Sequence, residues 1–487
     1  MTTIAGWRVR VEVGQLPRGA AMYDDPAATY GVARYDAASA VEMSWVSINC
    51  QVRSVDCARG TDARGAPYIV AEAGTLTARL HDPDRLLDPT ISTGSVFAEP
   101  GVPVRVVATR EGAPLPGGGV YDSSRYDSGA VYGEDTLGGV PIWSGYADTW
   151  THDLRTGEGT LTASDVLARL AGTRISDFDR PAESTVDRIG AIIGALGDDA
   201  PPTTYHGTGA MLSAAALSGD CRSLLAKVAE SSMSWVWATA AGALAWKSRS
   251  AVMADPVPLV DCDDGSSAVY TGMSSAAMVQ RIVNRATLQR VRADAAEQAG
   301  SRLYQVSESV DRYGESTYAA NDLQLLDDAS VDLYAQALFD LRAWPRPHLA
   351  TIDVLTSEAF PWAARSLTRM VGVDVGDTVT VSLSSRGDPA QVFGSVVTGV
   401  SHSIVPGEWL TTLDVAPYTL LDAPQQPGGV GRYDEALYGS GAVYGTEVGT
   451  GIPPGASPAA GLYDDPEATY DGVAVYDTLQ FATTGRW

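Results

Sequence analysis

Apolar and polar residues alternate in short runs through the first third of the chain. The clearest runs are Trp7–Val13, Val46–Val52, Gly74–Leu80, Val102–Val107 and Gly159–Ala163. Alternation with a period of two places successive side chains on opposite faces of a strand, and the Gly, Pro and Asp clusters between the runs are typical of turns. The sequence therefore predicts an N-terminal β-barrel domain over residues 1–172.

The pattern changes to helical spacing after this region. Ser164–Gly172 and Ser184–Leu196 both carry apolar residues at helical spacing, and Ser184 is the predicted N-cap of the second helix. A third amphipathic helix is predicted over Cys221–Glu230.

A hairpin is predicted directly after these helices. Ser234–Ala238 and Ala243–Lys247 flank an Ala-Gly turn, and we expect Trp235 and Trp237 to lie in the core. The helices and the hairpin together predict a small α+β domain over residues 173–277.

A second alternating region begins near residue 278. It includes Ile282–Val291, Val373–Val381 and Val392–Val400, and one helix, Ala329–Ala343, interrupts it and ends ahead of a proline. We therefore predict a second barrel over residues 278–421. The predicted fold class is mainly β with an α+β middle: two split β-barrel-like domains, a small α+β domain between them and an irregular C-terminal arm.

The chain also contains an internal repeat. Tyr23–Tyr30 (YDDPAATY) recurs as Tyr463–Tyr470 (YDDPEATY), and Ser128–Gly133 (SGAVYG) recurs identically as Ser440–Gly445. Such Tyr-Asp units lie in Gly-, Ser- and Pro-rich surroundings without strand or helix periodicity, which is typical of loops and extensions.

The repeats define two insertions, at about residues 17–42 and 111–140, and a C-terminal arm over residues 422–487. Tyrosine offers a large contact surface with little conformational entropy to lose, so these rings are candidate anchors on neighbouring subunits. An aromatic ring beside a carboxylate also suits a sugar, so a glycan-binding surface remains the alternative. The candidate interface residues are Tyr23, Tyr30, Tyr35, Tyr121, Tyr126, Tyr132, Tyr433, Tyr438, Tyr444, Tyr463, Tyr470 and Tyr476.

Composition narrows the classes of function. The chain has 487 residues, enough for two to four domains, and a formal net charge of -25. Phosphate binding needs clustered Lys and Arg, so we expect no binding to nucleic acid and none to an anionic membrane surface.

The longest weakly polar run, Val236–Trp246, is far short of the ~20 residues that cross a bilayer, so no membrane insertion is expected. The N-terminus lacks a secretory-signal pattern, so we expect no export.

Catalytic and metal-binding motifs are missing from the sequence. It contains no GxSxG, GxxxxGK or HExxH motif and no CxxC pair, so we predict no catalytic residue, no bound metal and no cofactor. The cysteines are interpreted as buried free thiols. Asp and Glu are plentiful, and this leaves glycoside hydrolysis open, although no carboxylate pair stands out.

Several segments, taken in order, resemble one known family. They are Gly74–Asp84 (GTLTARLHDPD), Ile142–Trp150 (IWSGYADTW), Val283–Leu288 (VNRATL), Val375–Val381 (VGDTVTV) and Gly399–Trp409 (GVSHSIVPGEW). Their order is similar to that in the minor tail proteins, or baseplate (tail-tip) hub proteins, of long-tailed phages. The Tyr-Asp-rich insertions make the chain similar to actinobacteriophage members in particular.

The resemblance covers about residues 1–420 and implies a structural virion protein without enzymatic activity. It implies a homotrimer whose two hub barrels per chain build a ring at the tail tip and adapt the hexameric tail tube to a trimeric tip. The implied partners are the distal tail or tail-tube protein, the tape measure protein and other minor tail proteins. A receptor- or cell-wall-glycan-binding minor tail protein is the alternative, and a tail-embedded cell-wall hydrolase is a third hypothesis.

Overall fold

The computed structural model describes most of the chain between residues 2 and 417. The described residues are 2–15, 44–48, 51–60, 69–82, 85, 88, 101–110, 139–254, 260–263, 268–276, 282–291, 301–345, 348–360, 362–383 and 391–417.

The described residues are mainly β, as the sequence predicts, and fifteen of the described strands belong to one curled sheet. The N-terminal sheet half contributes eight antiparallel strands in the order β1-β2-β7-β8-β9-β6-β4, with β3 also paired to β2. These strands are β1 (Thr2–Ile4), β2 (Trp7–Gln15), β3 (Ser44–Ser47), β4 (Gln51–Gly60), β6 (Glu72–His81), β7 (Pro103–Arg110), β8 (Val140–Asp153) and β9 (Glu158–Ser164).

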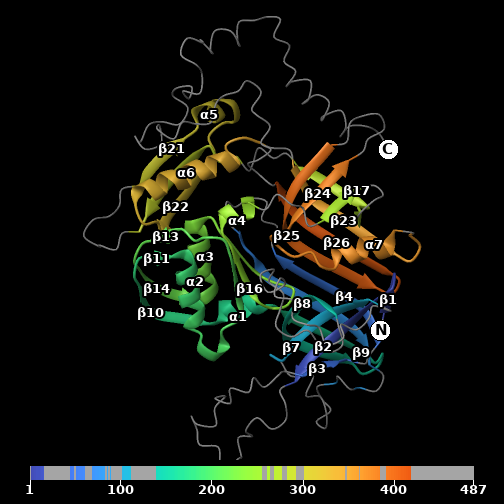
Figure 1. The fold of residues 1–487 in the computed structure, drawn as a ribbon. Coiled ribbons are helices and arrows are strands. Elements are labelled where there is room, and N and C mark those ends of the chain that lie inside the picture. Colours follow the sequence, from blue (N-terminus) through green and yellow to red (C-terminus); the bar gives the residue numbers. More distant parts are fainter. Residues whose placement is uncertain are drawn as a thin grey trace, which may run out of the picture.

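The C-terminal sheet half continues the same sheet. Its strands are β17 (Val260–Asp263), β18 (Ala268–Val269), β19 (Gly272–Ala276), β23 (His348–Ser357), β24 (Thr378–Leu383), β25 (Gln391–Val405) and β26 (Glu408–Pro417). Helix α7 (Ala363–Met370) lies between β23 and β24 in the chain and contacts β23. Figure 1 shows the two halves side by side, blue to teal for the N-terminal strands and orange for β23–β26 of the C-terminal half.

Strand β25 joins the two halves because it changes partner along its length. Its first part pairs with β24, up to the pair Val396–Thr378, and its later part pairs with β4, from Gly399–Gly60 onward. The other edge of β25 pairs with β26 throughout this region, with a bulge at the change of partner. A strand shared in this way makes the two halves one continuous hydrogen-bonded body.

The middle unit, residues 166–254, packs against both halves. It contains α1 (Val166–Gly172), β10 (Arg174–Arg180), β11 (Glu183–Ser184), α2 (Thr185–Gly194), the 3-10 helix η2 (Gly197–Asp199), β12 (Thr203–His206), β13 (Met211–Leu212), β14 (Ala215–Asp220), α3 (Cys221–Ser232), β15 (Trp235–Ala238), β16 (Leu244–Lys247) and α4 (Arg249–Ala254). The short strand β5 (Ile69–Val70), which precedes β6 in the chain, pairs with β15 of this unit.

Local sequence explains the elements of the middle unit. The Ser184 hydroxyl accepts a hydrogen bond from the backbone N–H of Asp187 at 3.1 Å, which confirms the predicted N-cap of α2. The predicted hairpin forms as β15 and β16, with Trp237 and Trp246 buried and Trp235 partly buried. Cys221 and, in β4, Cys57 are free and buried.

A separate three-stranded sheet follows the middle unit, and we call it with its helices the α6 unit, residues 283–344. Its elements are β20 (Arg285–Arg290), β21 (Arg302–Gln305), α5 (Ser307–Tyr313), β22 (Thr317–Leu323) and α6 (Asp328–Arg342). Tyr334, Leu338 and Phe339 of α6 form its core with Leu288 of β20 and Leu323 of β22.

The predicted domain limits can be set beside these pairings. The predicted barrel at 278–421 carries one expected helix, whereas the structure describes α5, α6 and α7 there. Strand β20 pairs with β21 and β22 and not with the large sheet. Strands β17–β19, inside the predicted 173–277 domain, pair with the C-terminal sheet half. Which sheet a strand joins depends on its pairing with distant segments, and the periodicity within one segment does not predict this pairing.

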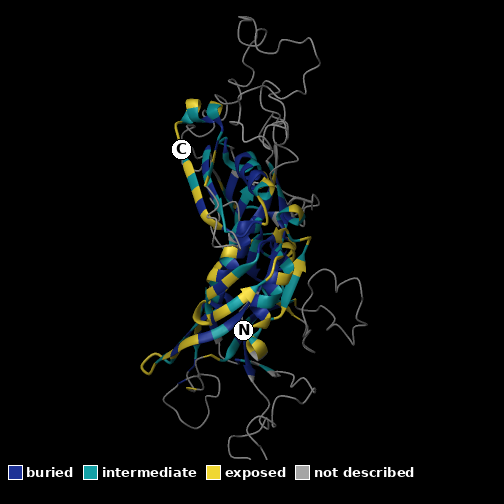
Figure 2. Cartoon of the chain, turned by 90° about the vertical axis from the view of Figure 1, so that its left-hand side faces the viewer, coloured by how far each residue is buried: buried dark blue, intermediate teal, exposed yellow. Residues whose placement is uncertain are grey.

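The core of the described residues consists of three buried apolar clusters. Figure 2 shows buried positions along the whole length of the described elements, with exposed positions on the outer surfaces. One buried cluster combines Trp143 and Leu161 of the N-terminal half with Trp409 and Ile404 of the C-terminal half. Another joins the middle unit to the C-terminal strands. Apolar packing therefore holds each unit to its neighbour, and the polar contacts below fix how they meet.

Candidate functional site: two polar junctions

Two groups of buried and partly buried polar side chains lie where units meet. The first junction consists of Arg59, Asp165, Lys247, Asp374 and Asp377, and it connects both sheet halves to the middle unit. The second junction consists of Arg180, Glu183, Arg188, Ser213 and Gln324, and it connects the middle unit to the α6 unit.

Arg59 is the centre of the first junction. Alternate residues of β4, Val55, Cys57 and Arg59, are buried on the same side of the strand, so the charged group continues an apolar row. Its Nη1 pairs with Asp374 Oδ1, and its Nε donates to the carbonyl oxygen of Ile142 at 3.1 Å. The side chain of Arg59 is 2% exposed and that of Asp374 is 26% exposed, so water shields this ion pair only from the aspartate side.

A close backbone approach brings Arg59 into place. The next residue, Gly60, has φ +88°, and a Cβ at this position would lie 2.3 Å from the carbonyl oxygen of Thr398 and 2.7 Å from Cα of Gly399. Glycine avoids both the strained φ and the clash. β4 can therefore lie against β25 at the point where β25 changes partner.

Asp165 fixes α1 to the N-terminal sheet half. One carboxylate oxygen accepts from the backbone N–H of Leu167 at 2.9 Å and caps α1, and the other accepts from Gly74 of β6 at 2.7 Å. Burial raises the pKa of Asp165 to about 6 although both hydrogen bonds and the charge of Arg59 favour the ionised form.

His402 of β25 lies fully buried near Arg59. Burial, and after it the charge of Arg59, lower the pKa of His402 to about 3. Its Nδ1 accepts a hydrogen bond from Nε1 of Trp409 at 3.2 Å, which requires an unprotonated nitrogen there. The imidazole is therefore neutral and serves packing at the β25–β26 hairpin.

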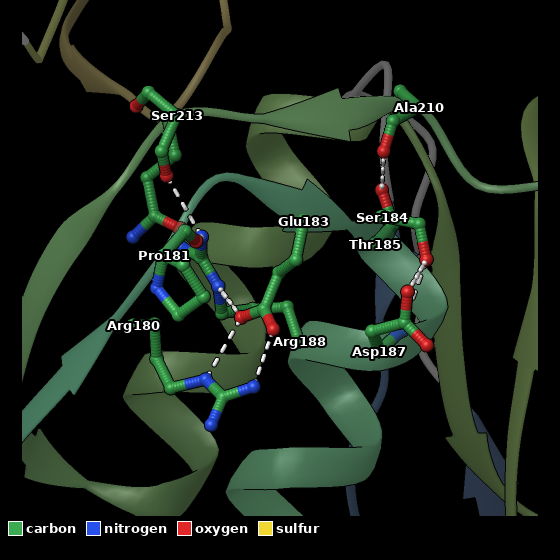
Figure 3. Close-up of polar contacts among 10 residues, drawn as sticks. Arg180, Pro181, Glu183, Ser184, Thr185, Asp187, Arg188, Ala210 and Ser213 are labelled. Atoms are coloured by element: carbon green, nitrogen blue, oxygen red, sulfur yellow. Dashed lines mark hydrogen bonds and ion pairs between the residues drawn. The ribbon is translucent and has the colours of Figure 1, made fainter.

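Arg188 is the centre of the second junction and is fully buried on α2. Its Nε donates to Glu183 Oε1 at 2.5 Å and its Nη1 donates to Gln324 Oε1 at 2.9 Å. Its Nη2 donates to the carbonyl oxygens of Pro181 and Ser213, at 2.9 and 2.7 Å. Figure 3 shows the guanidinium surrounded by acceptors from several segments of the middle unit.

The second junction has more cations than carboxylates. Glu183 accepts from Arg188 and also from Arg180, whose Nε lies 2.9 Å from Oε1. Burial opposes ionisation of Glu183, but the hydrogen bonds and charges of the two arginines outweigh it, so the pKa of Glu183 lies below its usual value. Gln324 continues the network into the α6 unit, because its backbone N–H donates to Ser231 Oγ at 2.9 Å and its carbonyl accepts from the N–H of Ser213 at 3.0 Å.

The twelve candidate interface tyrosines lie outside the described residues, as do the arm at 422–487 and nearly all of the two insertions. Their role stays a prediction. In the described part of the chain, no group of three or more His, Cys, Asp or Glu side chains could hold a metal ion. None of the described helices is both long and apolar enough to span a membrane.

Sequence reasoning missed both junctions, although signals for them were present. Arg188 shares the inward stripe of α2 with Thr185, Ile189 and Ile192, and Arg59 continues the inward row of β4. A charged residue at an apolar position of a pattern indicates a buried, paired charge. The partners Asp374 and Gln324 lie 315 and 136 residues away, and no local pattern identifies them.

No protein-family model matches the chain, and no curated protein sequence matches it. Similar solved structures include three tail proteins. The tail protein from Neisseria meningitidis has a TM-score of 0.49 at 11% identity, with 84% of this chain and 97% of that chain covered. The 43 kDa tail protein of prophage MuSo2 from Shewanella oneidensis has a TM-score of 0.47 at 10% identity, covering 84% and 98%.

Prophage tail protein gp18 from Listeria monocytogenes has a TM-score of 0.41 at 8% identity, with 84% of this chain and 95% of that chain covered. All three TM-scores lie below 0.5. Function therefore has to be inferred from the residues and contacts of this chain itself.

Proposed function

We propose that this chain is a structural protein of a phage tail tip that forms the hub ring at the end of the tail tube. The proposal rests on the place in the fold where the segments that resemble the hub-protein family meet. Gly74–Asp84 supplies the backbone N–H that binds Asp165, Val375–Val381 opens with the turn beside Arg59, and Gly399–Trp409 begins at the close approach to Gly60. Segments more than 300 residues apart thus converge on the first junction.

The arrangement suits a ring protomer mechanically. A ring that bears load needs subunits that keep their shape, and a sheet continuous across both halves, together with two buried ion-pair networks, resists relative movement of the units. Among the described strands, β1 of the N-terminal half and β19 of the C-terminal half are paired antiparallel at an edge, and such edges can pair with successive tube subunits. Such a role needs no catalytic group.

Within this proposal the chain is a homotrimer located in the virion tail tip. Its partners are the distal tail or tail-tube protein, the tape measure protein and other minor tail proteins, and its two halves adapt six tube-end subunits to three-fold tip components. Actinobacteriophage origin and adaptation of symmetry rest on the sequence resemblance described above.

Electron microscopy of the purified full chain, with class averaging and mass measurement at several concentrations, tests the proposal. We expect a three-fold ring with a central channel and six similar lobes. A monomer at every concentration that also forms no ring when the tail-tube protein is added would contradict it.

The Tyr-Asp repeats motivate a second proposal, that these segments anchor the ring to neighbouring tip proteins. Deletion of residues 425–487 should then remove a neighbour from assembled particles, as mass spectrometry of purified tails would show. Unchanged tip composition, together with loss of saturable binding to host cell-wall glycans, would favour the glycan-binding alternative instead.

A further inference from the structure

The turn Asp374–Asp377, which we call the acidic turn, lies directly before β24 and contacts three parts of the molecule. Asp374 pairs with Arg59 of β4 through Oδ1, and its Oδ2 accepts from the backbone N–H of Ala240 at 3.1 Å. Ala240 belongs to the loop between β15 and β16, so a single carboxylate links the N-terminal sheet half to the middle unit.

The backbone of the acidic turn is held from two further sides. The N–H of Gly376 donates to the carbonyl oxygen of Val397 at 2.8 Å, and the N–H of Val397 donates to that of Asp377 at 2.8 Å. Lys247 of β16 donates from Nζ to the carbonyl oxygen of Gly376 at 3.1 Å. The Trp237 ring lies against Gly376, where an added Cβ would be 3.0 Å from it. The turn therefore fills the place where β25 changes partner.

Charges converge on this turn from every side. The backbone N–H of Asp374 donates to Asp377 Oδ2 at 2.7 Å, so the two carboxylates belong to one tight turn. Arg59 faces it from β4 and Lys247 from β16, while Asp165, at the start of α1, also interacts with Arg59. Three carboxylates thus share two cations, and the nearby His402 of β25 is neutral.

Burial and the surrounding charges together set the pKa of Asp377. Burial is the largest cause that raises its pKa, and the negative charge of Asp374 adds to it. The hydrogen bond from the N–H of Asp374, followed by the charges of Lys247 and Arg59, opposes the shift, and the result is a pKa of about 7. Asp377 therefore changes charge in a range where ordinary aspartates remain ionised.

We propose that the acidic turn is a proton-sensitive latch that holds the middle unit against the two sheet halves when Asp377 is protonated and loosens when Asp377 is ionised. In the protonated state Asp374 is the only charge of the turn, and Arg59 and Lys247 balance it together with Asp165. Loss of the proton adds a second negative charge within one turn, and its repulsion with Asp374 acts on the contact between Asp374 and Ala240.

Hydrogen exchange of the full chain measured by mass spectrometry tests the latch. Peptides covering residues 239–243 and 371–377 would be followed from pH 5.5 to 8.5, with rates corrected for intrinsic exchange. We expect their protection to fall about tenfold as pH rises, with a midpoint near the pKa of Asp377, which corresponds to about 1.4 kcal/mol of opening free energy. Asp377→Asn should keep the turn protected across this range.

A matched control is Asp199→Asn, because Asp199 is 79% exposed and lies outside both junctions. This variant should keep the wild-type response. A protection change that persists in Asp377→Asn, or its absence in the wild-type chain, would overturn the proposal.

Lys247→Met provides a test that does not need the asparagine variant to fold. The charge of Lys247 lowers the pKa of Asp377, so its removal should move the midpoint of the exchange profile to higher pH. An unchanged midpoint, or a shift to lower pH, would contradict the assignment to Asp377. The measurement is made on the chain alone, so it can fail while the ring proposal stands, and the reverse also holds.

Discussion

Both junctions connect units through a buried arginine, but one has more cations than carboxylates and the other has fewer. Both place a buried arginine between units, Arg59 at 2% side-chain exposure and Arg188 at 0%. The second junction surrounds one carboxylate, Glu183, with two arginines, and this favours the ionised state. The first has more carboxylates than cations, and the pKa of Asp377 rises. Burial opposes ionisation at both carboxylates, and the comparison teaches that the hydrogen bonds and cations around a carboxylate decide whether this effect is outweighed.

The largest effect is expected from Arg188→Met. The substitution leaves Glu183 and Gln324 without their buried partner, and breaking a buried ion pair from one side costs about 3–5 kcal/mol. Chemical denaturation should show this loss of unfolding free energy. The control Arg169→Ala removes an exposed pair with Asp199 and should cost less than about 1 kcal/mol. Similar losses for the two variants would mean that Arg188 does not hold the units together.

Arg59→Met should have a smaller effect, about 2–4 kcal/mol, because Asp374 is partly exposed and water can solvate it when the arginine is gone. Denaturation measured by the same method as for Arg188→Met makes the comparison direct. A loss that clearly exceeds that of Arg188→Met would reverse the order that burial predicts.

The pH dependence of stability should separate the junctions. Asp377 has a raised pKa in the folded protein, so its stabilising contribution is complete below the unfolded pKa of about 4 and is lost as pH rises through about 7. Between pH 5 and 8, wild type should lose about 2 kcal/mol relative to Asp377→Asn. Glu183 has a lowered pKa, so its contribution is lost only as pH falls below the usual glutamate range.

The stability of wild type is compared with that of Asp377→Asn because two other groups also contribute to the pH dependence. Asp165, with a pKa raised to about 6, acts in the same direction as Asp377, and His402 acts in the opposite direction. Its folded pKa of about 3 lies below the unfolded value, so it favours unfolding as pH falls. Glu183→Gln serves as the comparison and should shift stability by the same amount at pH 5.5 and pH 8. A pH-dependent shift in Glu183→Gln equal to that of Asp377→Asn would remove the distinction between the junctions.

The smallest effect is expected from Ser184→Ala at the start of α2. It removes the side-chain cap beside the second junction and leaves Arg188 intact, and a lost N-cap costs about 1 kcal/mol. Thermal unfolding should show a modest decrease in Tm. A loss as large as that of Arg188→Met would show that the start of α2, and not the arginine, controls this junction.

Local sequence was sufficient for most elements with a clear period. The predicted helices at 184–196, 221–230 and 329–343 correspond to α2, α3 and α6, and the hairpin around Trp237 is present. The short helices α5 and α7 were not predicted. They have seven and eight residues, which is too short for a stable isolated helix, and α7 contacts strands β18 and β23.

The sequence by itself determined the mainly β character, the capped helices and the inward rows on which Arg59 and Arg188 lie, because periodicity and capping are properties of neighbouring residues. Only the tertiary structure decided that β25 joins two halves into one sheet, that β20 belongs to a separate sheet, and that Asp374 meets Arg59. The physical reason is that strand pairing and buried ion pairs connect residues that are far apart in the chain. Their free energy depends on burial and on every charge nearby, which a local pattern does not contain.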